Sequence, residues 1–99
     1  MKIAFIGGGN MGEAILSRIL ERKLSTRKTT FISDISESRR QSLKQTYRVN
    51  TTDNNRSAAV VSEVVLLAIK PQNLTQVMAE LNEQLKPSQL VLSIAAGTK

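Results

Sequence analysis

The chain has 99 residues, of which 40% are hydrophobic and 22% are charged, a composition typical of one soluble globular domain. It contains no cysteine, which excludes a disulfide framework and thiolate chemistry. No apolar run approaches the roughly 20 residues that span a bilayer, and the short N-terminal run breaks into glycines, unlike a signal peptide. We therefore expect a cytoplasmic protein without a membrane partner.

The net charge of +6 raises the question of nucleic-acid binding. The basic residues are scattered along the chain, and of the three aromatic residues Phe5 and Phe31 lie within apolar stretches. The chain therefore lacks aromatic platforms on which bases stack. We expect no nucleic-acid partner and attribute the charge to solvated helix surfaces and to attraction for a phosphate-rich small ligand.

The first 16 residues, MKIAFIGGGNMGEAIL, predict a short buried strand over residues 2–6 and a helix over residues 10–23. A strand, a tight turn and a helix N-terminus in succession form an anion site, because unpaired backbone N–H groups and the helix dipole face the turn.

Three glycines in the turn, Gly7, Gly9 and Gly12, fit the spacing G-x-G-x-x-G, with Gly8 in the first gap. The first glycine permits the turn, the second lets a pyrophosphate approach the backbone, and the third lets helix and strand pack closely. The alternative is a tight turn without a ligand. In this strand–helix context the motif favours a dinucleotide site.

The rest of the chain continues the alternation of strands and helices. The predicted elements are a strand over 29–33, a helix over 37–47, a brief strand over 49–51, a short helix capped by Asp53 or Asn54 and ending at 60 or 61, a buried strand over 63–69, a helix from Pro71 to residue 85, and a strand over 90–94. This alternation predicts an α/β fold, a Rossmann-type doubly wound parallel sheet, in one domain over residues 1–99. The carboxyl ends of the strands should line one edge, where such folds bind ligands.

Asp34 lies at the end of the second predicted strand, 22 positions after Gly12. An acid at about this spacing commonly binds the ribose 2′-OH of NAD and repels the 2′-phosphate of NADP. Arg39 and Arg40 favour the opposite choice, because guanidinium groups pair well with phosphate. Solvent-facing charges are the alternative for these residues. The charges alone do not distinguish the two cofactors, so we expect either NADP(H) or NAD(H).

Three segments, MKIAFIGGGNMGEAIL, LLAIKPQ and LVLSIAAG, resemble the N-terminal domain of pyrroline-5-carboxylate reductase. The similarity covers essentially the whole chain, with the motifs in the family's order. Members of that family reduce the cyclic imine 1-pyrroline-5-carboxylate to L-proline, the last step of proline synthesis. The resemblance implies a Rossmann fold that binds a nicotinamide dinucleotide for hydride transfer.

The resemblance also implies roles for matching positions. The glycine turn would hold the pyrophosphate, the end of the second strand and an Asn after the third would meet the adenosine half, and the last two strand ends would line the nicotinamide. The implied cofactor-binding residues are Gly7, Gly8, Gly9, Asn10, Met11, Gly12, Ser33, Asp34, Arg39, Asn55, Ala68, Ile69, Lys70, Pro71, Ala95 and Ala96.

The chain departs from the family pattern in two respects. NADPH-preferring members often carry Ser or Asn followed by Arg where this chain has Asp34 and Ile35, which leaves Arg39 as the expected phosphate partner. Family members also continue into a helical domain that dimerises and holds the imine substrate, whereas this sequence stops soon after SIAAG. We therefore expect that domain to be absent and the homo-oligomer to form through it in the full-length enzyme.

The chain contains no His or Cys to donate a proton to the imine nitrogen. Lys70 is one possible acid, but we assign it to the cofactor side and name no catalytic residue or metal ligand. The 99 residues alone should bind cofactor with little turnover. The alternatives are a stand-alone nucleotide-sensing module and the first domain of another two-domain NADP-dependent reductase.

Overall fold

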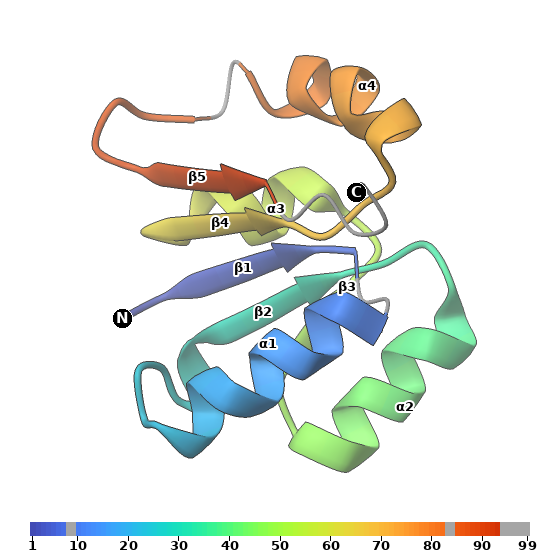
Figure 1. Cartoon of the computed structure of the whole chain (residues 1–99), viewed down its shortest axis with the longest axis vertical. Helices are drawn as coiled ribbons and strands as arrows, with labels where there is room; N and C mark the ends of the chain where they lie inside the picture. Colours follow the sequence, from blue (N-terminus) through green and yellow to red (C-terminus); the bar gives the residue numbers. More distant parts are fainter. Residues whose placement is uncertain (8–9, 83–84, 94–99) are drawn as a thin grey trace.

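The computed structural model describes residues 1–7, 10–82 and 85–93. Its strands form one parallel sheet in the order β3-β2-β1-β4-β5 (Figure 1). The strands are β1 (Ile3–Ile6), β2 (Thr30–Ser33), β3 (Asn50–Thr52), β4 (Val64–Leu67) and β5 (Leu90–Ser93). The strand sequence starts at the centre of the sheet, moves outward to β3, crosses back to β4 and reaches β5 as the last described strand. The predicted doubly wound parallel sheet is thereby confirmed, and its switch point lies between β1 and β4.

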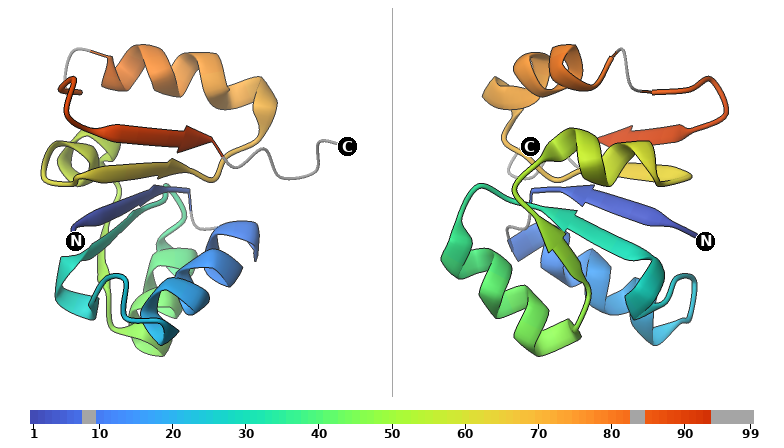
Figure 2. Two further views of the ribbon diagram at one scale, coloured as in Figure 1. Left: turned by 60° about the vertical axis from the view of Figure 1, so that its left-hand side comes forward. Right: turned by 180° about the vertical axis from the view of Figure 1, so that it is seen from behind.

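Helices cover both faces of the sheet (Figure 2). The helices α1 (Asn10–Glu21) and α2 (Glu37–Tyr47) pack on one face, and α3 (Asn55–Val60) and α4 (Pro71–Leu81) pack on the other. Right-handed crossovers require this division, because the chain runs in opposite directions away from β1 on the two sides of the switch point. Among the described residues, no helix is long and apolar enough to cross a membrane.

The central strand β1 is buried along its whole length, as expected for a parallel strand covered on both faces. Ile3 and Phe5 point to the face of α1 and α2 and pack into a cluster with Leu16 and Leu43. Ala4 and Ile6 point to the opposite face and join the cluster beneath α3 and α4. The period of two along one strand therefore divides the core into two layers.

Several predicted boundaries differ from the structure. The first helix ends at Glu21 rather than at residue 23, because Lys23 takes a left-handed conformation (φ 60°) and the N–H of Leu24 closes the turn on the carbonyl of Ile19. The expected loop before β2 contains a 3₁₀ turn, Arg27–Thr29, capped by the side chain of Thr26.

The other boundaries shift by a few residues. The last described helix ends at Leu81 rather than at residue 85, and residues 83–84 lie outside the described residues. Of the strand predicted over 63–69, only Val64–Leu67 belongs to β4. The predicted strand over 49–51 is β3, Asn50–Thr52, and Asn54 rather than Asp53 caps α3.

The edge strand β5 is less covered than the centre of the sheet. Leu90 and Leu92 are 53% and 45% exposed, whereas Val91 between them packs against the cluster beneath α3 and α4. Leu90 and Leu92 pair in register with Val64 and Leu66, so they extend the face on which α1 and α2 lie. Within the described residues this apolar part of the sheet stays open to solvent.

Candidate functional site

Backbone hydrogen bonds link the carboxyl ends of β1, β2, β3 and β4 along one edge of the sheet, as the alternation of elements predicts. The N–H of Gly7 donates to the carbonyl of Ser33 (2.7 Å), and the N–H of Ala68 donates to that of Ile6 (2.8 Å). On the outer side, the N–H of Asp34 donates to the carbonyl of Thr52 (3.0 Å). These bonds extend the sheet past its regular strands and place the first glycine, the acid and the end of β4 in one row.

At the switch point, Gly7 and the end of β4 are in close contact. Gly7 has a φ of +95°, a conformation that residues with a Cβ rarely adopt. A Cβ at this position would lie 2.5 Å from the carbonyl oxygen of Ala68 and 3.0 Å from Cγ2 of Ile69. The absence of a side chain at Gly7 therefore lets the chain turn away from β1 against the backbone of Ala68, the residue that follows β4.

Gly12 lies in the first turn of α1 and is buried. A Cβ on it would lie 3.1 Å from Cβ of Ala68, 3.4 Å from the carbonyl oxygen of Gly7 and 4.0 Å from Cδ2 of Phe5. This glycine brings the start of the helix close to the sheet, the role expected of the third glycine in the motif.

The helix α1 begins at Asn10, directly beyond the turn, so its first N–H groups and the positive end of its dipole lie at this edge. Gly8 and Gly9 lie outside the described residues, as do the side chains of Asn10 and Met11. The described backbone shows the turn conformation at Gly7 and the close packing at Gly12. Both fit a dinucleotide whose pyrophosphate rests on the helix N-terminus.

Asp34 follows β2 and is half-buried. Its Oδ1 accepts the N–H of Ser36 (2.9 Å), and its carbonyl oxygen accepts Nη1 of Arg40 (2.7 Å). Ser36 in turn caps α2 by accepting the N–H of Arg39. The loop after β2 thus holds the carboxylate of Asp34 at the sheet edge, in the position predicted for contact with the adenosine ribose.

The hydroxyl of the buried Ser33 donates to Oδ1 of Asn55 (2.5 Å), and Nδ2 of Asn55 donates to Oε1 of Glu80 (3.1 Å). The structure therefore brings these two predicted site residues together. Their bond joins β2 to the start of α3, and the bond to Glu80 joins α3 to α4. A role of Asn55 toward adenosine remains a prediction.

Arg39 and Glu13 form an ion pair between α2 and α1, with Nη2 of Arg39 2.6 Å from Oε1 of Glu13. The second carboxylate oxygen of Glu13, Oε2, accepts the hydroxyl of Tyr47 at 2.8 Å. The hydrogen bonds from Tyr47 and then from Arg39 lower the pKa of Glu13 below its ordinary value. Burial, and then the bond to Glu13, raise the pKa of Tyr47.

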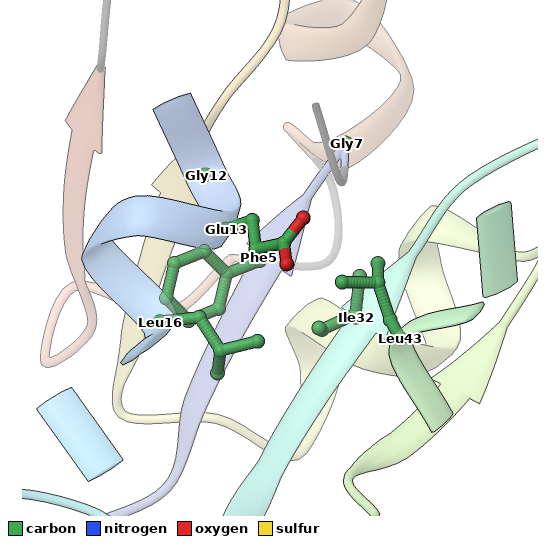
Figure 3. A pocket seen from close by; sticks show the side chains of 7 residues that line it. All are labelled: Phe5, Gly7, Gly12, Glu13, Leu16, Ile32 and Leu43. Atoms are coloured by element: carbon green, nitrogen blue, oxygen red, sulfur yellow. The ribbon is translucent and has the colours of Figure 1, made fainter. Parts of the chain in front are cut away.

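A narrow crevice runs beneath Glu13, between the glycine turn and α2 (Figure 3). Apolar side chains from four elements line it, and the carboxylate of Glu13 lies above them. The lining residues are Phe5, Gly7, Gly12, Glu13, Leu16, Ile32 and Leu43. The crevice is too narrow to admit a water molecule. It is a narrow gap in the core between the glycine turn and α2.

The segment after β4 provides the remaining described part of the edge. Ala68 and Ile69 are half-buried, whereas Lys70 and Pro71 are exposed. Lys70 is the N-cap residue of α4, and Pro71 takes the first helical position, as predicted. Ala95 and Ala96 lie outside the described residues.

Sequence inspection did not single out Glu13 or Tyr47. Two signals were available: Glu13 directly follows the last glycine of the motif, and Arg39, Leu43 and Tyr47 recur every four residues on one side of α2. The contact between these side chains depends on how α1 and α2 pack, which the spacing does not specify.

Residues 2–97 match the family described as NADP oxidoreductase, coenzyme F420-dependent. The chain belongs to this family. Among the relatives of this chain, the pyrroline-5-carboxylate reductases of Synechocystis sp. and Vibrio alginolyticus are each 41% identical to it, over 98% and 97% of the chain. They align over only 36% and 35% of their own length, so the chain spans about a third of these relatives.

A solved pyrroline-5-carboxylate reductase from Coxiella burnetii contains the fold of this chain within its own longer chain. The two superpose with a TM-score of 0.89 at 32% sequence identity. The match covers 99% of this chain and 36% of the solved one. The resemblance noted from the three sequence segments is confirmed by these relatives.

Proposed function

We propose that these 99 residues form the nicotinamide-dinucleotide-binding part of a pyrroline-5-carboxylate reductase, which reduces 1-pyrroline-5-carboxylate to L-proline in the cytoplasm. The observation that carries the proposal is the turn at Gly7. Its positive φ and its contact with the end of β4 place the N-terminus of α1 at the switch point of the sheet. The family description, which names NADP, and the relatives named above support the same assignment.

In this proposal the residues of the chain bind and orient the cofactor. The pyrophosphate rests on the N–H groups beyond Gly7, the adenosine ribose lies near Asp34, and the nicotinamide lies beside Ala68 and Ile69. When bound, the dinucleotide supplies the hydride for imine reduction. Lys70 stands exposed at the start of α4, on the nicotinamide side.

We assign the imine pocket, the proton donor and the contacts of a homo-oligomer to parts of the enzyme beyond these residues. A dinucleotide site without an imine pocket binds but does not reduce, because hydride transfer requires both reactants in one geometry.

The proposal predicts nucleotide binding by the 99-residue chain without appreciable turnover. Fluorescence titration with NADPH and NADH should give saturable binding of at least one of them, and addition of pyrroline-5-carboxylate should produce little or no proline. Failure of both nucleotides to bind would refute the proposed function. Rapid reduction of the imine would contradict the assignment of the substrate pocket to other parts of the enzyme.

Replacing the carboxylate of Asp34 should shift nucleotide preference toward NADPH. Asp34→Asn removes the charge that opposes a 2′-phosphate, yet it keeps an oxygen that can accept the N–H of Ser36. We expect the ratio of the NADPH and NADH dissociation constants to change about tenfold in favour of NADPH, the size of one charge repulsion near a protein surface. Parallel titrations measure this ratio.

Glu21→Gln is the matched control, since it removes one carboxylate at the far end of α1. Its ratio should equal that of the unmodified chain. An unchanged ratio in Asp34→Asn would contradict the position given to the ribose.

A further inference from the structure

Arg39, the residue predicted to bind a ribose 2′-phosphate, is already engaged by a carboxylate of its own chain. Its Nη2 lies 2.6 Å from Oε1 of Glu13, and the two side chains are only 26% and 33% exposed. Partial burial weakens screening by salt and water, so this ion pair is stronger than a fully exposed one. A phosphate must therefore compete with Glu13 for the guanidinium.

Tyr47 holds Glu13 in this position from the other side. Its hydroxyl donates to Oε2 of Glu13, so both carboxylate oxygens have a donor from α2. The two donors keep Glu13 ionised at neutral pH, and the raised pKa of Tyr47 keeps its proton in place. Glu13 is thus a fixed negative charge.

The location of this charge matters for the proposed ligand. Glu13 directly follows Gly12 in the first turn of α1, and its carboxylate lies above the crevice between the glycine turn and α2 (Figure 3). Arg39 extends from the first turn of α2, which follows Asp34 at the end of β2. A dinucleotide bound across this edge would bring its adenosine ribose close to both groups.

We propose that Glu13 is a specificity-determining residue that lowers the affinity for 2′-phosphorylated dinucleotides by occupying Arg39. Tyr47 acts as a positioning residue, because it fixes the carboxylate that occupies the arginine. This inference rests on the proposed function, and it concerns the choice between NADPH and NADH rather than binding itself. It differs from the role proposed for Asp34, whose carboxylate would meet the ribose hydroxyls directly.

The test is parallel titration of NADPH and NADH against four chains: the unmodified protein, Glu13→Gln, Arg39→Gln and the double variant. Glu13→Gln should shift the ratio of dissociation constants about tenfold toward NADPH, as expected for loss of a competing charge. In the Arg39→Gln background the same change should shift the ratio by less than about twofold, because the two residues are coupled.

Two further variants separate this role from a structural one. Tyr47→Phe, which leaves both charges in place, should move the ratio in the same direction by a smaller factor. Glu37→Gln removes a carboxylate from the first turn of α2 that is not paired with Arg39 in the ion pair described above, and it should leave the ratio unchanged. Urea unfolding of each variant verifies that the chains titrated are folded.

A shift toward NADH in Glu13→Gln would mean that Glu13 orients Arg39 for the phosphate, and it would overturn the inference. An unchanged ratio, or a full shift that persists without Arg39, would overturn it as well. If the unmodified chain binds neither nucleotide, the proposed function fails and the inference fails with it. Binding with an unaltered ratio defeats the inference alone.

Discussion

Gly7→Ala is expected to abolish dinucleotide binding and to lower the free energy of unfolding by about 2–4 kcal/mol. Two costs add at this position. Alanine is strained at a φ of +95°, and its Cβ would lie 2.5 Å from the carbonyl oxygen of Ala68. Relief requires the turn and the end of β4 to separate, which displaces the N-terminus of α1 from the switch point. Urea denaturation and nucleotide titration measure the two effects.

Gly12→Ala provides the matched comparison, because its new methyl group meets a different obstacle. At 3.1 Å the nearest atom is Cβ of Ala68, which Ala68→Gly removes. We expect Ala68→Gly to restore stability to Gly12→Ala but not to Gly7→Ala, since the obstacle at Gly7 is the backbone oxygen of residue 68. Equal rescue of both variants would contradict the geometry described for the turn, as would a Gly7→Ala chain of unchanged stability.

Phe5→Ala is expected to lower the free energy of unfolding by about 3–5 kcal/mol, the usual cost of removing a buried phenyl ring. Phe5 is 1% exposed and packs with Ile3, Leu16 and Leu43 in the layer beneath α1 and α2. Its ring also lies under Gly12, so the cavity would form directly below the candidate site. A typical domain has only about 5–15 kcal/mol of stability, so the variant should melt far below the unmodified chain.

Leu24→Ala is the control for this prediction. Leu24 is 53% exposed in the loop after α1, so its truncation should change stability by less than about 0.5 kcal/mol. Thermal and urea unfolding, followed by circular dichroism, measure both variants. If the two substitutions lowered the free energy of unfolding by similar amounts, Phe5 would not be a major stabilising residue of the core on this face.

Much of the fold was predictable because its signals are local. The fully apolar run before Gly7 indicates a strand buried on both faces, and the alternation of strands and helices then leaves few topologies. Pro71 and Ser36 mark helix starts through backbone chemistry that depends on near neighbours alone. The positions of the strand ends follow from the same alternation, so the row from Gly7 to Asp34 was expected.

The candidate site was less predictable where it depends on packing between distant segments. Whether Arg39 faces solvent, a ligand or Glu13 is decided by the packing of α1 against α2. The partner of Asn55 likewise depends on the approach of α3 to β2 and α4. The end of α1 was predicted at residue 23 rather than at Glu21, because the helical spacing of apolar residues does not reveal the left-handed conformation of Lys23.

The contact between Gly7 and Ala68 joins residues 61 positions apart in the chain. The strand pairs that support it, such as Ile3 with Val64, span the same separation. Such high contact order means that the glycine motif has no local precursor during folding: its shape exists only after the two halves of the polypeptide have met. A nucleotide that binds this conformation adds its binding free energy to the stability of the whole sheet. The melting temperature should therefore rise as the nucleotide site becomes occupied.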